Sequence, residues 1–254
     1  MKVLSNFFLI LNVFYFFSCG EMKNEEKLNV LFLSAGSGEP NTSHNGKINH
    51  HKLKPNFLRN NINITYSSDL NSLNANTLPK YDAIIMYLSA ANEKPERISA
   101  LIDYVERGGG LVAIHNTSGA FGGDKDFVNL IGGEFDRHGS GIFKARIING
   151  KENHPALKGV AEFEVWDETY VHKNLNEDRI DLMVRDENGK PEPWVWVRSQ
   201  GKGRVFYSAY GHDGRVWENF DFQQLVTSAT VWASNKKVNI NHNIPNLTYT
   251  SDAD

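Results

Sequence analysis

Cysteine is almost absent from the 254-residue chain, which contains only Cys19. Disulfide bonds, cysteine metal sites and thiol nucleophiles are therefore excluded from everything that follows this residue. An excess of one charge sign is also lacking, because 27 Lys and Arg residues against 30 Asp and Glu residues leave a formal net charge of -3. Since no long basic run occurs either, we expect no nucleic-acid partner.

Phosphate-loop and hydrolase signatures are missing as well. No strand candidate is followed by GxGxxG with an acidic partner, and neither a P-loop nor a GxSxG elbow occurs. The composition does provide 40% hydrophobic residues, enough to bury a sizeable core. We therefore expect one globular domain over residues 28–235, followed at 236–254 by an unstructured tail rich in Asn, Thr and Asp.

The first residues have the anatomy of an export signal. An apolar stretch, Phe7 to Phe17, is short for a membrane span and is followed by Ser18-Cys19-Gly20. A small residue before the cysteine resembles the bacterial lipobox, which implies that Cys19 is lipidated. We predict a signal segment at 1–19, a polar tether at 20–27 and an exported lipoprotein held at a membrane, periplasmic or on the cell surface. An uncleaved anchor helix and a soluble-export signal are the alternatives.

Apolar runs alternate with helical segments in the first half of the domain. Such runs are typical of strands buried on both faces of a parallel sheet. The helix expected from Pro95 to Arg107 has proline in its first turn and stops at three glycines. This alternation predicts an α/β fold with a doubly wound sheet and right-handed crossovers. The expected strands are Leu28–Leu33, Ile62–Tyr66, Tyr81–Tyr87 and Leu111–His115, with a further helix at Lys52–Arg59.

The second half of the domain contains short strand candidates before a closing helix, Asp221 to Ala233. We expect some of these extra strands to extend the sheet and others to form a hairpin cover over the crevice at the strand ends. The candidates are Phe143–Ile148, Glu162–Val165, Ile180–Val184, Trp194–Arg198 and Arg204–Ser208.

The functional crevice of an open α/β sheet lies beyond the carboxyl ends of its strands. His115 ends one expected strand and His212 follows another, while Glu168 and Tyr170 lie in the segment 166–172. If these segments meet, two imidazoles, a carboxylate and a phenol are available for general acid–base chemistry. His115, Glu168 and His212 also form a candidate ligand set for a divalent metal ion. Taken singly, residues of these types at such positions more commonly have a structural or solvated role.

Side chains that suit a sugar surround these candidates. Carboxylates and imidazoles hydrogen-bond hydroxyl groups, and the rings of Trp166, Trp196 and Trp217 can stack on a pyranose, although core or lid packing is the commoner role of each. The substrate-binding set is His50, Asn116, Trp196 and Asp213. The remaining histidines have weaker expectations. We expect His51 either at the crevice or in solvent and His154 in a turn, and the sequence does not place the loop that carries His138. We predict no functional role for His44 and His242.

Several distinctive motifs are distributed along the domain. These motifs are Tyr81-Asp82, Gly108-Gly109-Gly110-Leu111-Val112-Ala113-Ile114-His115, Leu130-Ile131-Gly132-Gly133-Glu134-Phe135, Asn153-His154-Pro155, Asp167-Glu168-Thr169-Tyr170, Trp196 with Gly201-Lys202-Gly203-Arg204-Val205-Phe206-Tyr207, Gly211-His212-Asp213 and Val231-Trp232-Ala233. In order and spacing they resemble the ThuA-like (trehalose utilisation) family over Asn29 to Ser234. The resemblance implies a flavodoxin-like fold similar to that of class I glutamine amidotransferases.

The resemblance also implies which residues form the site. His115, Glu168, Tyr170 and His212 match the family's characteristic positions, together with a histidine after the first strand, for which His50 is preferred over His44 and His51. Amidotransferases carry a cysteine nucleophile after a central strand, where this chain has His115-Asn116-Thr117. Glutaminase and cysteine-protease chemistry are therefore excluded.

The family resemblance points to sugar catabolism, beside a dehydrogenase that makes 3-keto sugars. A ketone at C3 acidifies the C2 proton, so that a His or Glu base can remove it, the C1 substituent leaves, and hydration completes a net hydrolysis. We assign His115 and His212 as metal ligands or enolate stabilisers, Glu168 as base or ligand, and Tyr170 as acid. The alternatives are a non-catalytic carbohydrate-binding lipoprotein and hydrolysis of unoxidised glycosides by Glu168 with Asp213.

Overall fold

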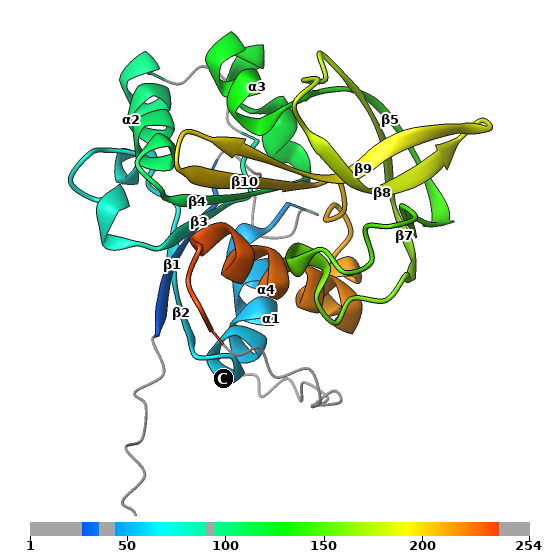
Figure 1. Ribbon diagram of the computed structural model, residues 1–254, viewed down its shortest axis with the longest axis horizontal. Helices are drawn as coiled ribbons and strands as arrows, with labels where there is room; N and C mark the ends of the chain where they lie inside the picture. The colour runs from blue at the N-terminus through cyan, green and yellow to red at the C-terminus, as the bar shows by residue number, and fades with distance from the viewer. Residues whose placement is uncertain (1–26, 36–43, 90–93, 239–254) are drawn as a thin grey trace, which may run out of the picture.

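The computed structural model describes residues 27–35, 44–89 and 94–238 (Figure 1). The predicted signal segment with Cys19, nearly all of the tether, His242 and most of the tail lie outside these ranges. Lys236 and Val238, which the sequence assigns to the tail, contact the domain instead. Lys236 forms an ion pair with Asp82, and Val238 packs against the core. Within the described residues, no helix combines the length and the apolar character that crossing a membrane requires.

Parallel strands form one half of the main sheet. Its order, β2-β1-β3-β4-β10, is the flavodoxin-like order, and all four pairings are parallel. The strands predicted from apolar runs are therefore confirmed, because β3 and β4 are buried along their whole length. Their bounds are β1 Leu28–Leu33, β2 Ile62–Ser67, β3 Ala83–Met86, β4 Gly110–Ile114 and β10 Gly203–Ser208.

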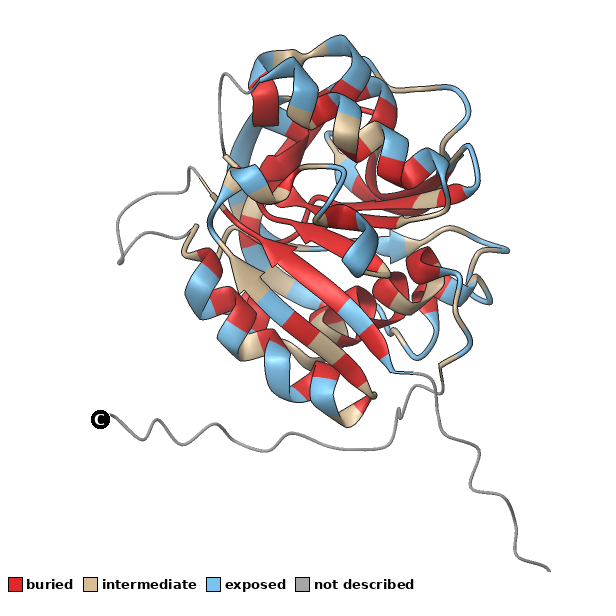
Figure 2. Cartoon of the chain, turned by 90° about the vertical axis from the view of Figure 1, so that its left-hand side faces the viewer, coloured by how far each residue is buried: buried red, intermediate tan, exposed pale blue. Residues whose placement is uncertain are grey.

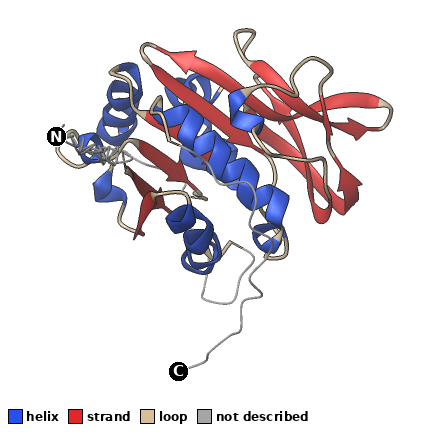
Figure 3. Cartoon of the chain, turned by 60° about the horizontal axis from the view of Figure 1, so that its bottom comes forward, coloured by secondary structure: helices blue, strands red, loops and turns tan. Residues whose placement is uncertain are grey.

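Helices cover both faces of the parallel half, α1 and α4 on one side and α2 and α3 on the other (Figures 1 and 3). The helix α3 was not predicted, because only seven residues lie between its cap Asp124 and Gly132, where φ reaches 93°. The helix α1 begins six residues before the predicted start, since Asn45 caps a polar first turn. The bounds are α1 Gly46–Arg59, α2 Pro95–Glu106, α3 Lys125–Ile131 and α4 Phe220–Ser234.

Antiparallel strands form the other half of the molecule. The strands β9, β8 and β6 extend the main sheet beyond β10, whereas β5 and β7 pair as a separate two-stranded ribbon. Most of the extra strands are longer than predicted, because exposed polar strands such as β5 lack an apolar run. The predicted strand Phe143–Ile148 is instead divided between the end of β5 and the two-residue β6. Their bounds are β5 Glu134–Lys144, β6 Arg146–Ile147, β7 Glu164–Lys173, β8 Ile180–Glu187 and β9 Lys190–Gln200.

The core lies on the two faces of the main sheet, whose strands are the most continuously buried part of the chain (Figure 2). Trp194, Trp196 and Trp217 are fully buried within it. Short 3-10 segments connect the elements, the longest directly after β4. These segments are Leu70–Ser72, Leu78–Lys80, His115–Gly123, Pro155–Leu157 and Val216–Glu218.

Candidate functional site

Four titratable side chains converge beyond the carboxyl ends of the parallel strands. They are His44, His115, Glu168 and His212, and one potential ligand atom from each lies within 4.8 Å of the others. His115 follows β4, His212 lies in the loop after β10, Glu168 is on β7, and His44 precedes α1. We call this group the His/Glu cluster. Sequence segments as far as 168 residues apart therefore supply one site at the edge where α/β sheets bind ligands.

Backbone geometry directs the His115 side chain into the cluster. The residue has φ 51°, in the left-handed region, and its imidazole is completely buried. Its Nδ1 lies 2.9 Å from the carbonyl oxygen of Ala209, an arrangement in which Nδ1 carries the proton and donates. The Nε2 lone pair is then free, 3.3 Å from Glu168 Oε2, and makes no hydrogen bond with the described residues. This tautomer is the one that a metal ligand requires.

A buried polar chain supports His115 from behind. The Tyr207 hydroxyl donates to the carbonyl oxygen of His115 at 3.0 Å and lies 2.8 Å from Ser118 Oγ. His172 Nε2 lies 3.1 Å from the same hydroxyl, and His172 Nδ1 lies 2.9 Å from Glu192 Oε1. Because each link is buried or nearly so, the chain holds the unusual backbone of His115 in place.

The remaining contacts of the cluster centre on Glu168. Its Oε1 lies 3.0 Å from His212 Nδ1, which is itself 3.1 Å from His44 Nε2. His138, on the opposite ribbon strand, places Nδ1 3.6 Å from the same carboxylate oxygen. Tyr170 stacks on the His115 ring with 4.2 Å between the centroids. The site thus combines a carboxylate, four imidazoles and a phenol.

The neighbours in the cluster determine its charge. Burial acts to raise the pKa of Glu168, but the adjacent imidazoles of His115 and His212 outweigh it and hold the pKa well below the ordinary value. Burial acts to lower the pKa of His212, yet Glu168 raises it overall. Burial and the two neighbouring imidazoles lower the pKa of His44 to about 4. At neutral pH, Glu168 is therefore ionised and His44 is neutral.

These shifts predict a pH dependence for the metal-free protein. Folded His44 binds fewer protons than unfolded His44 between pH 6.5 and about 4, so the free energy of unfolding falls as the pH is lowered through this window. His212 acts in the opposite sense, since its raised pKa gives stability below pH 6.5 that is lost as the pH rises. We expect that in the His44→Ala variant the free energy of unfolding falls less steeply between pH 6.5 and 4. Urea unfolding of chelator-treated protein at a series of pH values measures this slope. An unchanged slope would contradict it, and His51→Ala, an exposed histidine of α1, is the control.

The structure brings together His115, Glu168, Tyr170 and His212, as predicted, but replaces His50 with His44. His50 is buried and packs against Phe32 and Tyr66, so its predicted substrate role is wrong. The reason is the close approach of α1 to the end of β1. A Cβ atom at Gly46 would collide with the Ser34 side chain, and this contact places the residues just before the helix, not those within it, at the crevice.

Three other predicted residues have structural partners. Trp196 is fully buried and donates from Nε1 to the carbonyl oxygen of Ile131, so it cannot stack on a substrate. Trp217 is likewise buried, although Trp166 remains 39% exposed. The Asn116 amide donates to Ser89, and its carbonyl oxygen is buried without a hydrogen-bond partner among the described residues. Asp213 is paired with Arg215 at 2.7 Å, so this carboxylate has a structural partner in the loop that carries His212.

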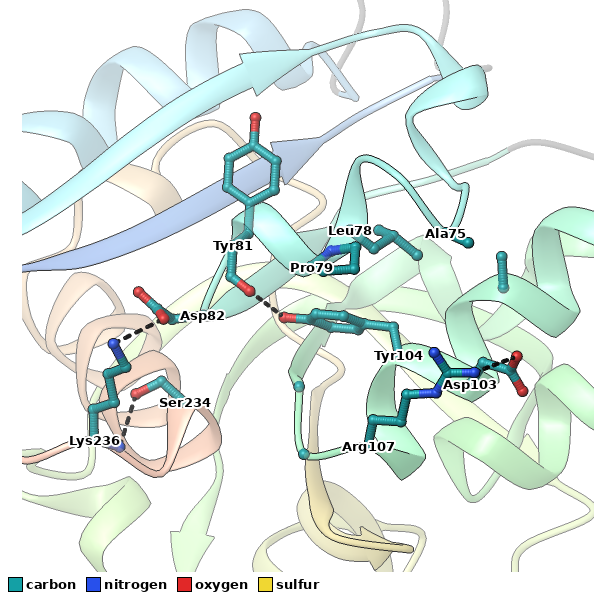
Figure 4. Close-up of a pocket in the computed structure, with 13 residues that line it drawn as sticks. Ala75, Leu78, Pro79, Tyr81, Asp82, Asp103, Tyr104, Arg107, Ser234 and Lys236 are labelled. Carbon is teal, nitrogen blue, oxygen red and sulfur yellow. Dashed lines mark hydrogen bonds and ion pairs between the residues drawn. The ribbon is translucent and has the colours of Figure 1, made fainter.

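A cavity of about 380 Å³ lies elsewhere, at the amino ends of β3 and β4 (Figure 4). Its charged groups are already paired, Lys236 with Asp82 at 3.0 Å and Arg107 with Asp103 at 3.5 Å. The Tyr104 hydroxyl donates to the carbonyl oxygen of Tyr81. The cavity therefore lies at the opposite edge of the sheet from the His/Glu cluster and shares none of its residues.

The sheet order and the polar cluster define an α/β protein of the flavodoxin-like, glutamine amidotransferase-like class, with a histidine–glutamate site where that class carries its ligand. The chain belongs to the ThuA family, described as trehalose utilisation, whose model matches residues 29–233. No curated protein sequence matches the chain.

Solved structures share this fold at low sequence identity. A ThuA-like protein from Bacteroides uniformis is 19% identical, with a TM-score of 0.69 over 83% of this chain and 92% of its own. A ThuA-like protein from Parabacteroides merdae is 18% identical, with a TM-score of 0.67 over 84% and 92%. A β-galactosidase from Bacillus circulans sp. alkalophilus is 14% identical, with a TM-score of 0.59 over 82% of this chain and 31% of that chain. At these identities the likeness concerns the fold alone.

Proposed function

We propose that this protein is a metal-dependent, sugar-processing enzyme whose centre is the His/Glu cluster. The observation that carries the proposal is the convergence of three imidazoles and one carboxylate within 4.8 Å. Such donors suit divalent first-row metal ions. A second observation also supports metal binding by these donors. The buried Nε2 of His115 has a free lone pair and lies close to the ligand atoms of the other three residues.

The number of ligands favours particular ions. Four protein ligands complete the tetrahedral shell of zinc, whereas an octahedral ion such as Mn²⁺, Co²⁺ or Ni²⁺ keeps two positions open. We therefore propose an octahedral ion, which when bound would polarise a substrate carbonyl. The low pKa of Glu168 supports its role as a ligand over that of a base, because a strongly stabilised carboxylate is a poor proton acceptor.

The proposed reaction is cleavage of a 3-keto glycoside. A base removes the C2 proton, the electrons of that C–H bond form a C1–C2 double bond, and the C1–O bond breaks as the leaving oxygen gains a proton. Water then adds across the double bond. His138 is the proposed base, since its half-exposed imidazole lies at the cluster edge, and Tyr170 donates toward the leaving oxygen. The family description supports a sugar substrate.

We further propose that the enzyme is exported and anchored in the cell envelope through Cys19. The support is the apolar stretch that ends at Ser18-Cys19-Gly20. A sugar dehydrogenase would supply the ketone that the reaction requires, because an ordinary glycoside has no acidic proton at C2.

The decisive experiment measures metal content and turnover on the same preparations. Elemental analysis should find about one divalent ion per chain, in keeping with one four-ligand site. Chelation should abolish release of the aglycone from a 3-keto glucoside, and Mn²⁺ or Co²⁺ should restore it. Glu168→Gln should lose metal and at least about 100-fold in turnover, a loss in the range of one catalytic group. Glu164→Gln, an exposed carboxylate on the same strand, is the matched control.

Three results would count against the proposal. Full turnover by chelator-treated protein would exclude a catalytic role for the metal. Full turnover by Glu168→Gln would exclude a catalytic role for this carboxylate. Metal-dependent sugar binding without turnover would favour the carbohydrate-binding alternative.

A further inference from the structure

The ribbon of β5 and β7 continues the site outward from the His/Glu cluster. Its register places Glu168 opposite Ser140 and Trp166 opposite Ile142. Alternate residues of a strand point to the same face, and directly opposed residues of an antiparallel pair share that face. Trp166 and Ile142 therefore occupy the same ribbon face as Glu168, about 7 Å farther along the strand by two residue steps.

Exposure rises along this face with distance from the cluster. Tyr170 is 5% exposed, whereas Trp166 is 39% exposed and Ile142 is 71% exposed. Large apolar side chains that meet on a surface beside a polar site commonly mark a ligand contact. Since the pair continues the face that carries Glu168, its proposed occupant is the part of the substrate that extends beyond the cluster.

The orientation of Trp166 is coupled to the loop that carries His212. The guanidinium carbon of Arg215 lies 5.4 Å from the Trp166 ring centroid. Asp213 holds Arg215 through two contacts, at 2.7 and 2.9 Å, and Asp213 in turn donates its backbone N–H to Asp167. One loop thus fixes both the cluster imidazole and the aromatic side chain.

We infer that Trp166 and Ile142 form a platform for the second sugar ring of a disaccharide whose first ring lies at the His/Glu cluster. The inference rests on the proposed function and adds to it the residues that contact the ring beyond the cleaved bond. An indole ring packs against the apolar C–H face of a pyranose, and Ile142 extends that surface. Arg215, exposed and held by Asp213, supplies donors for the hydroxyl groups of the same ring.

Calorimetric titration of the metal-loaded full chain with trehalose and with methyl α-glucoside tests the platform. Neither sugar has the ketone, so both bind without turnover. We expect the unaltered chain to prefer trehalose by about tenfold in Kd, which corresponds to a single good contact. Trp166→Ala should reduce this preference to about one, whereas Trp166→Phe and the control Ile180→Ala, an exposed isoleucine of β8, should retain it.

The outcomes separate this inference from the proposed function. A preference that persists in Trp166→Ala, or absence of trehalose binding to the unaltered chain, overturns the platform even if metal is bound. A chain that forms dimers which Trp166→Ala dissociates would also overturn it, because the face would then be a self-association surface. Absence of bound metal in every variant instead overturns the proposed centre.

Discussion

Replacement of His115 by alanine is expected to weaken divalent-metal binding by at least about 100-fold, more than the 10–100-fold typical of an outer-shell residue. His115 offers the one cluster imidazole whose tautomer is fixed by a backbone carbonyl, through Nδ1 and Ala209. Its ring is also fully buried and stacked on Tyr170, so a water molecule that replaced the lost ligand would have to enter a closed space. Competition titration with Co²⁺, followed through its visible absorption, measures the change.

The companion variant Tyr207→Phe separates ligation from positioning. It leaves every cluster ligand in place but removes the hydroxyl that donates to the carbonyl oxygen of His115. We expect a smaller loss of metal affinity, about tenfold, because the strained His115 backbone loses one support. His51→Ala, exposed on α1 and outside the cluster, should bind metal as the unaltered chain does. Unchanged affinity in folded His115→Ala would show that the cluster does not bind metal through this residue.

The second large effect is expected on stability. Trp217→Ala should lower the free energy of unfolding by about 3–5 kcal/mol, the usual result of deleting a large core aromatic. The side chain is fully buried and packs edge-on against Phe32, Tyr87 and Phe222. Its Nε1 donates to the carbonyl oxygen of Gly211, which also accepts from the Tyr87 hydroxyl. Urea unfolding followed by circular dichroism measures the loss.

Trp217→Ala should also weaken metal binding, since Gly211 immediately precedes His212. Trp217→Phe keeps most of the packing and loses one hydrogen bond, with an expected decrease in the free energy of unfolding of about 0.5–1.5 kcal/mol. Because the carbonyl oxygen of Gly211 keeps the Tyr87 hydroxyl as a donor, this milder variant keeps the test usable if the alanine variant does not fold. Trp166→Ala, partly exposed, should change stability by less than about 1 kcal/mol. Similar losses at both tryptophans would contradict the assignment of Trp217 to the core beneath the site.

The sequence predicted the parallel half of the fold because burial on both faces leaves a local signal. The strands β1, β3 and β4 are nearly continuous apolar runs, and such runs indicate their environment without reference to any partner. The ribbon strand β5 has no apolar run, because all of its residues are exposed or only partly buried. Its pairing with β7 depends on partner residues twenty or more positions away, which no local pattern encodes.

The candidate site divides in the same way. His115, Glu168 and His212 were identifiable because they follow or join strands in motifs that resemble the ThuA family. His138 carried no such signal, and for the histidine expected after the first strand the sequence offered His44, His50 and His51, with His50 preferred. His44 precedes a helix whose start depends on Asn45 and Gly46, and His138 reaches Glu168 only across the ribbon.

By itself, the sequence determined the α/β class and the exclusion of cysteine chemistry, since these follow from apolar runs that act locally and from composition. The flavodoxin-like arrangement of the first strands was implied by the resemblance of the sequence motifs to the ThuA family. Only the tertiary structure decided that His44 rather than His50 completes the cluster, that Trp196 and Trp217 are core residues, and that Trp166 lies exposed beside Glu168. Those outcomes depend on contacts between segments far apart in the chain, such as Gly46 against Ser34 and Arg215 over Trp166. Periodicity along the sequence reports the environment of a residue, whereas the identity of its neighbours is fixed only when the chain packs.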